Sequence, residues 1–218
     1  MNITVKTKYP VAFDSPDHIK PWGTKRDNTT NHAFIDEMHS HFKSTEDLDT
    51  FNFLDLGCSG GQLVVDFAKR GNLSVGLEGS DYSVIHGRAN WPEYYNKNLF
   101  TCDVTKPYLV YNEGNQVFFN LITAWEVVEH IHPGDLGRFF LFISDNLLPG
   151  GIFLASISTK HDNVEGVELH QSVFSREEWN ETKFNEVLMG LPLELHDYPF
   201  EHKVRSDASS FHIMLKRI

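Results

Sequence analysis

The stretch Phe51-Asn-Phe-Leu-Asp55-Leu-Gly57-Cys-Ser59-Gly-Gly61-Gln-Leu63 decides how this chain folds. Its apolar first half predicts a buried strand, its glycines predict a tight turn, and the residues that follow predict the start of a helix. Asp55 stands near the end of that strand, and Glu78 ends the next apolar run, at 73–78. The pattern therefore predicts the first crossover of a parallel sheet, with an acidic residue near the end of each strand.

The turn and the second acid indicate a site for an adenosine-containing cofactor. Glycines let the backbone bend sharply and approach a ligand, and the first N–H groups of the helix carry partial positive charge. Glu78 is expected to accept hydrogen bonds from both ribose hydroxyls. A dinucleotide site requires G-x-G-x-x-G, but counting from Gly57 the next two positions are Ser59 and Gln62. The acid and small residues of 55–61 instead fit S-adenosylmethionine, which needs no pyrophosphate cradle.

Four segments in this order resemble class I S-adenosylmethionine-dependent methyltransferases of the small-molecule type: Leu54-Asp-Leu-Gly-Cys-Ser-Gly-Gly61, Val75-Gly-Leu-Glu-Gly-Ser80, Phe100-Thr-Cys-Asp-Val104 and Phe119-Asn-Leu-Ile-Thr-Ala-Trp-Glu-Val-Val-Glu-His130. The resemblance covers residues 50–158 well, and Ser59 in place of glycine is a mild departure from it. It implies that the cofactor is bound by Asp55, Gly57, Cys58, Ser59, Gly61, Glu78, Gly79, Asp103, Val104, Trp125 and Glu126. Among these, Glu78 would hold the ribose, and Asp103 with Val104 would flank the adenine.

The alternation of apolar runs and helical patterns predicts an α/β fold with a Rossmann-like, doubly wound, mostly parallel seven-stranded sheet and an antiparallel C-terminal strand. Strands are expected near 51–56, 73–78, 97–102, 118–124, 151–157, 193–200 and 209–217. Helices are expected near 29–43, 60–70, 81–90, 135–148 and 175–187. We expect one domain over 1–218, with an N-terminal cap segment (1–50), a cofactor-binding core (51–158) and a region of substrate loop, helix and edge strands (159–218).

Composition narrows the functional classes. Hydrophobic residues make up 40% of the 218-residue chain, as in a folded domain. The formal net charge of −11 argues against a nucleic-acid partner, whose phosphates would be repelled. No apolar run is long enough to insert into a membrane, and the N-terminus has no signal core, so a cytoplasmic location is expected. Cys58 and Cys102 lie in predicted cofactor loops and indicate no disulfide framework.

Two histidines are candidate catalytic bases. A hydroxyl acceptor usually has to lose a proton during methyl transfer, whereas a free amine need not. His130 follows the fourth predicted strand of the core, and His170 lies in the loop after the fifth, before a predicted capping box at Ser175 and Glu178. The alternatives are that His130 orients its loop and that His170 bonds to backbone. The histidine pairs lack the spacing of a zinc site, so no metal is expected.

The segment 20–31 has two interpretations. It mixes Trp22, Lys25 and Arg26 with amide side chains ahead of a predicted helix. It is either a lid whose Lys25 or Arg26 binds a carboxylate, or a solvated lead-in with Asn28 or Thr29 as the helix N-cap.

The function expected is methyl transfer from S-adenosylmethionine to an oxygen or nitrogen atom of a small molecule or of a sugar- or lipid-linked precursor. A nucleotide-cofactor oxidoreductase and a catalytically silent binding subunit with the same fold remain as alternatives.

Overall fold

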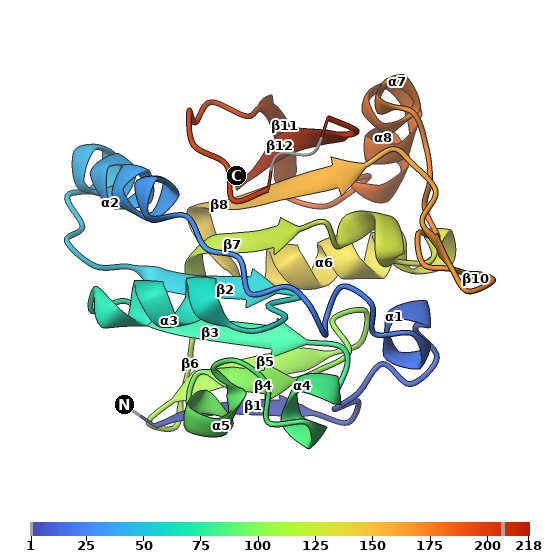
Figure 1. The fold of residues 1–218 in the computed structure, drawn as a ribbon. Coiled ribbons are helices and arrows are strands. Elements are labelled where there is room, and N and C mark those ends of the chain that lie inside the picture. Colours follow the sequence, from blue (N-terminus) through green and yellow to red (C-terminus); the bar gives the residue numbers. More distant parts are fainter. Residues whose placement is uncertain (1, 206–207) are drawn as a thin grey trace.

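The computed structural model describes residues 2–205 and 208–218 and is built around a seven-stranded sheet (Figure 1). The strands of this sheet are β2 (Asn52–Leu56), β3 (Leu73–Glu78), β4 (Leu99–Thr101), β7 (Phe119–Trp125), β8 (Leu147–Ser158), β11 (Leu193–Asp197) and β12 (Ser210–Arg217). They lie in the order β11-β12-β8-β7-β2-β3-β4. The contacts β8-β7-β2-β3-β4 are parallel, and β12 is antiparallel to both of its neighbours. The predicted fold class, including the antiparallel C-terminal strand, is therefore confirmed.

Two smaller sheets were not predicted. The first joins β1 (Ile3–Thr7), β5 (Tyr108–Asn112) and β6 (Asn115–Gln116) in an antiparallel arrangement, and the second pairs β9 (Asn163–Val164) with β10 (Val167–Glu168). Ile3 is buried and pairs with Asn112, far along the chain. The N-terminal segment is thus tied into the molecule by a pairing that no local pattern reveals.

The helices are α1 (Pro16–Ile19), α2 (His32–Glu46), α3 (Gln62–Lys69), α4 (Tyr82–Ile85), α5 (Trp91–Tyr94), α6 (Leu136–Asn146), α7 (Arg176–Glu178) and α8 (Phe184–Val187), with a π-helical turn at Trp179–Lys183 and 3₁₀ turns at Val128–His130 and Pro133–Asp135. The helix expected over 81–90 ends at Ile85, because Gly87 takes a positive φ. Asn31, not Asn28 or Thr29, caps α2, and it accepts a hydrogen bond from the N–H of Phe34. Within residues 2–205 and 208–218, no helix has both the length and the apolar character needed to cross a membrane.

The hydrophobic core lies on both faces of the large sheet. Successive residues of β2 point to opposite sides, as the pleat requires: Phe53 packs with α2 and α3, whereas Leu54 packs with α6 and the helical segment 176–187. Figure 1 shows the carboxyl ends of β2, β3 and β7 opening toward α1, so the N-terminal segment lies beside the edge where ligands bind in such sheets.

Candidate active site

A cavity of about 930 Å³ opens at the carboxyl ends of the parallel strands. Its walls come from the turns after β2, β3, β4 and β7, from the loop after β8, and from the N-terminal segment. Ten of the residues predicted for the site line it: Gly57, Ser59, Glu78, Gly79, Asp103, Val104, Trp125, Glu126, His130 and His170. This volume is in the range of small-molecule and cofactor sites.

Three predicted cofactor residues do not line the cavity, and their expected direct contact with the cofactor is not supported. Asp55 is buried and accepts a 2.6 Å hydrogen bond from the hydroxyl of Thr123, so it links β2 to β7. Cys58 packs in the core on the α2 and α3 side. Gly61 begins α3 with φ +81°, and a side chain there would strike Leu99. These three residues lie on the interior side of the turn, away from the cavity, and support the turn there.

The turn after β2 is shaped by positive backbone angles. Gly57 has φ +71°, and a Cβ atom there would collide with Val127. Ser59, in the position where the family pattern has glycine, also takes a positive φ of 46°, which costs energy in any residue with a Cβ atom. Its hydroxyl lies 3.1 Å from the carbonyl oxygen of Thr24 and 2.9 Å from that of Asp27. The serine therefore connects the turn to the N-terminal segment.

Glu78 is positioned by the same turn. Its carboxylate accepts hydrogen bonds from the backbone N–H groups of Ser59 (2.7 Å) and Ser80 (3.2 Å), one on each oxygen. Each carboxylate oxygen can accept a further hydrogen bond. Burial raises the pKa of Glu78 to about 6, and the two backbone hydrogen bonds oppose this rise. The side chain is thus a fixed, buried acceptor at the wall of the cavity.

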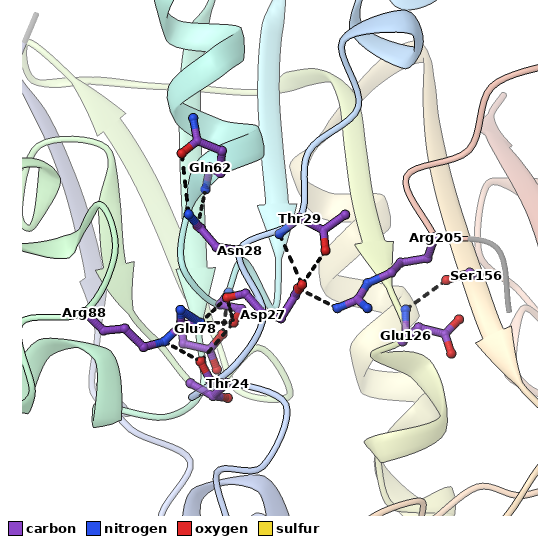
Figure 2. Close-up of polar contacts among 11 residues, drawn as sticks. Thr24, Asp27, Asn28, Thr29, Gln62, Glu78, Arg88, Glu126, Ser156 and Arg205 are labelled. Atoms are coloured by element: carbon purple, nitrogen blue, oxygen red, sulfur yellow. Dashed lines mark hydrogen bonds and ion pairs between the residues drawn. The ribbon is translucent and has the colours of Figure 1, made fainter.

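Residues 22–29 form a strap over the turn (Figure 2). Arg88 donates hydrogen bonds to the carbonyl oxygens of Thr24 and Asp27 and, at 2.9 Å, to the hydroxyl of Ser59. Asn28 accepts a 3.1 Å hydrogen bond from the N–H of Gln62 and so caps α3, whose own cap, a glycine, has no side chain. The strap is thereby bound to the start of the helix and to the cofactor turn.

The strap borders the cavity, but the two cations that the lid interpretation named do not reach it. Trp22 lines the cavity, but Lys25 and Arg26 do not, and both cations lie over the ring of Trp22 instead. The cation that reaches the cavity from this side is Arg205, which pairs with the carboxylate of Asp27 at 2.6 Å. The sequence did not point to Arg88, Asp27 or Arg205 as site residues, because the partners of these side chains are distant in the chain.

The first part of the N-terminal segment borders the other side of the cavity. The N–H of Ala12 donates to the carbonyl oxygen of Gly79, and the N–H of Asp103 donates to that of Tyr9, both at 2.9 Å. Asp103 also accepts hydrogen bonds from the backbone and hydroxyl of Thr105. The turns after β3 and β4 are thus joined by residues 9–12.

Trp125 and Glu126, at the end of β7, line the cavity. Trp125 is buried and packs edge-to-face on Phe34 of α2, with ring centroids 5.4 Å apart. Glu126 has a positive φ of 55°, accepts a 2.9 Å hydrogen bond from the hydroxyl of Ser210, and donates its N–H to the hydroxyl of Ser156. Trp125 thus forms part of the cavity wall and also packs in the hydrophobic core.

His130 and His170 lie together at one end of the cavity. Their rings meet edge-to-face, with centroids 4.6 Å apart. Nδ1 of His130 lies 2.7 Å from the carboxylate of Asp17, and Nδ1 of His170 lies 2.5 Å from the carbonyl oxygen of Lys160. Sequence reasoning missed Asp17, which is brought here by α1. The capping box at Ser175 and Glu178 is present as predicted.

The two histidines differ in protonation. Burial lowers the pKa of His130, but the carboxylate of Asp17, 2.7 Å from Nδ1, outweighs burial and raises the pKa to about 9. Burial, together with the charge of His130, lowers the pKa of His170. Near pH 7 the imidazole of His170 is therefore neutral, whereas that of His130 is protonated and positively charged. Beneath them, burial raises the pKa of Glu129 to about 8, against the lowering effect of the charge on His130.

Comparison with known proteins identifies the family. A model of the methyltransferase domain matches residues 24–200. A search of the curated proteins finds no match. Among solved structures, the chain is similar to magnesium protoporphyrin IX methyltransferase from Synechocystis with bound S-adenosylmethionine, at 13% identity and TM-score 0.57, covering 94% of each chain.

Two further solved structures share the fold. One is an amino pentose methyltransferase from Micromonospora echinaspora, at 14% identity and TM-score 0.55, covering 91% of this chain and 95% of that one. The other is an S-adenosylmethionine-dependent methyltransferase from Clostridium acetobutylicum, at 14% identity and TM-score 0.55, covering 84% and 89%. The family match favours transfer of a methyl group over the oxidoreductase and silent-subunit alternatives. The chain belongs to the methyltransferase domain family and is an S-adenosylmethionine-dependent enzyme.

Proposed function

We propose that this enzyme moves the methyl group of S-adenosylmethionine to an oxygen or nitrogen atom of a small molecule or of a sugar- or lipid-linked precursor. The proposal is supported by one observation: Glu78, the turn at Gly57 and Ser59, and the two histidines His130 and His170 all line the same cavity. Structural relatives are named for action on a porphyrin, an amino pentose and a glycopeptide, which are acceptors of this breadth.

The cofactor would lie along the strand ends. In this arrangement Glu78 binds the ribose hydroxyls, Gly79, Asp103 and Val104 border the adenine, and the turn at Gly57 and Ser59 borders the methionine part. Support comes from the burial of Glu78 at the cavity wall and from the backbone hydrogen bonds that fix its carboxylate. A fixed acceptor loses little conformational freedom when the ligand binds.

The acceptor would lie at the end of the cavity occupied by His130 and His170, with Trp125 and Glu126 between it and the adenine side. The sulfonium methyl is already activated, so the protein mainly has to hold the acceptor atom in line with it. Such positioning is worth roughly 7–11 kcal/mol of barrier. Of the two imidazoles, His170 is neutral near pH 7 and has its Nδ1 already hydrogen-bonded, leaving Nε2 for the acceptor side.

Isothermal titration with S-adenosylmethionine, S-adenosylhomocysteine and NADH tests the cofactor assignment. Binding of the first two, and none of NADH, is expected. Methyl-labelled S-adenosylmethionine supplied with mixtures of hydroxyl and amine compounds then tests the acceptor. Binding of NADH alone would overturn the assignment, and label found only on nucleic acid would overturn the acceptor class.

A further inference from the structure

Three side chains at the acceptor end form what we call the histidine–glutamate cluster: Glu129, His130 and His170. Each offers one ligand atom, and these atoms lie within 4.8 Å of one another. Glu129 and His130 belong to the 3₁₀ turn after β7, and His170 comes from the loop after β10. Sequence spacing does not reveal the cluster, because the fold brings its two halves together.

Each imidazole has an oxygen close to Nδ1, which is a hydrogen-bond acceptor in the case of His170 and an ion-pair partner in the case of His130. The carboxylate of Asp17 faces Nδ1 of His130 at 2.7 Å, and the carbonyl oxygen of Lys160 faces Nδ1 of His170 at 2.5 Å. A carboxylate and a carbonyl only accept, so the hydrogen of each neutral imidazole belongs on Nδ1, and Nε2 is the atom left for a ligand. Metal binding would release the second proton of His130 and the proton of Glu129. Histidines that bind metals are held in this manner, through the other ring nitrogen, by a carboxylate or a backbone carbonyl.

Glu129 supplies an unsatisfied oxygen. Its side chain is 0% exposed, and Oε1 accepts a 3.0 Å hydrogen bond from the N–H of Ser158. Oε2 has no hydrogen-bond partner in the part of the chain that the structure describes. The same holds for Oε1 of Glu126, one turn earlier in the same segment. A buried carboxylate oxygen without a partner is costly, and a cation bound by the cluster would satisfy that of Glu129.

We propose that the histidine–glutamate cluster binds one divalent transition-metal ion of the zinc type, with Glu129, His130 and His170 as ligands and Asp17 orienting His130. Two imidazole nitrogens and a carboxylate suit such an ion, whereas magnesium prefers a shell of oxygen ligands. Three protein ligands leave room for a further ligand from the cavity, as in catalytic zinc sites.

This proposal rests on the proposed function and narrows its acceptor to a hydroxyl. The hydroxyl oxygen would coordinate the ion, which lowers the pKa of that hydroxyl and lets its proton pass to water. An oxygen lone pair then forms a bond to the methyl carbon. The carbon–sulfur bond breaks, with its electron pair going to sulfur, and the products are a methyl ether and S-adenosylhomocysteine. In this account His130 and His170 hold the ion and do not themselves remove the proton.

Zinc titration of the chelator-treated full chain tests the site. Calorimetry with zinc chloride is expected to show one site, weakened at least ~100-fold in His170→Ala and Glu129→Gln and about 10–100-fold in Asp17→Asn. His196→Ala, an exposed histidine on β11, is the matched control and should bind as the wild type does. Cobalt chloride, followed by visible absorption, should give a spectrum that His170→Ala lacks.

The outcomes separate this inference from the proposed function. Each variant is also titrated with S-adenosylhomocysteine, and unchanged binding shows that the variant is folded. If the wild type binds that ligand but takes up zinc no better than His170→Ala, the metal site is refuted and the methyltransferase assignment stands. If chelator treatment leaves methyl transfer to a hydroxyl compound at full rate, the metal site is also refuted. Failure to bind S-adenosylhomocysteine would refute the proposed function, whatever zinc does.

Discussion

The backbone N–H of Ser59 donates a 2.7 Å hydrogen bond to the carboxylate of Glu78. The two parts of the sequence that indicated the cofactor, the glycine-rich turn and the distal acid, are thus in direct contact. The glycine-rich turn fixes the carboxylate of Glu78, and this carboxylate gives the N–H group of Ser59 a hydrogen-bond acceptor.

Replacing Glu78 with Gln is predicted to weaken S-adenosylmethionine binding by about 10- to 150-fold. A hydrogen bond to a charged acceptor contributes about 1.5–3 kcal/mol, and about 1.4 kcal/mol corresponds to a factor of ten. Gln keeps an oxygen for the N–H of Ser59, but its NH2 group would replace the oxygen that accepts from the N–H of Ser80, so that hydrogen bond is lost as well. Calorimetry measures the effect, with Glu93→Gln on the exposed surface of α5 as control. Equal affinity in Glu78→Gln and the control would remove Glu78 from the ribose site.

Cofactor affinity is predicted to fall at acidic pH. The pKa of Glu78 is raised by burial to about 6. Below that pH the carboxylate gains a proton and loses acceptor capacity, so the dissociation constant should rise, approaching tenfold per pH unit. Titrations between pH 5 and pH 8 in the wild type and Glu78→Gln provide the measurement. The variant should show a flatter profile, and parallel profiles would contradict the account.

Asp55 is predicted to make stability fall as pH rises. Burial raises its pKa from 3.8 to about 7, while the hydrogen bond from Thr123 lowers it. The folded state therefore binds this proton more tightly than the unfolded state, so the free energy of unfolding decreases between pH 3.8 and about 7. Asn at this position can still accept the hydrogen bond but has no proton to lose.

Urea unfolding of the wild type and Asp55→Asn at pH 5 and pH 8 tests this prediction. The variant should gain stability relative to the wild type as pH rises. Groups that do not interact with Asp55 titrate equally in both proteins, so their effect cancels in the difference. Asp27 and Glu78, whose charges act on Asp55, contribute to the difference together with it. A stability difference that stays constant with pH would show that Asp55 is not held in this environment.

The strap is predicted to loosen in Ser59→Gly. Glycine relieves the positive φ of 46° but removes the hydroxyl that contacts Thr24, Asp27 and Arg88. Amide hydrogen exchange over residues 22–29 should accelerate several-fold, and cofactor dissociation should accelerate with it. Arg88→Met removes a second connection, the hydrogen bonds to the carbonyl oxygens of Thr24 and Asp27, and should act in the same direction. Unchanged exchange in both variants would show that these hydrogen bonds do not hold the strap.

The sequence predicted those parts of the fold that local patterns control. The strand Asn52–Leu56, its glycine-rich turn and the alternating elements up to β8 follow from hydrophobic periodicity and turn chemistry. The pairing of β1 with β5 was missed, because short strands with alternating polarity give little signal and their partner lies far along the chain.

The same distinction between local patterns and contacts of distant segments applies to the residues of the candidate site. Glu78 and the turn are encoded within one crossover, and their side-by-side position could be predicted from spacing. The contacts of Asp17 with His130, of Arg88 with Asp27 and of Arg205 with Asp27 join distant segments. Asp55, Cys58 and Gly61 stand in motif positions but face the protein interior. A motif identifies the loop, whereas packing decides which of its residues line the cavity.

A crystal structure of the enzyme with S-adenosylhomocysteine would show directly whether Glu78 and the turn after β2 bind the cofactor. The account predicts the ribose hydroxyls within hydrogen-bond distance of the Glu78 carboxylate, the adenine beside Asp103 and Val104, and the sulfur facing the end of the cavity that holds His130 and His170. A ligand bound elsewhere, or a ribose without contact to Glu78, would contradict it.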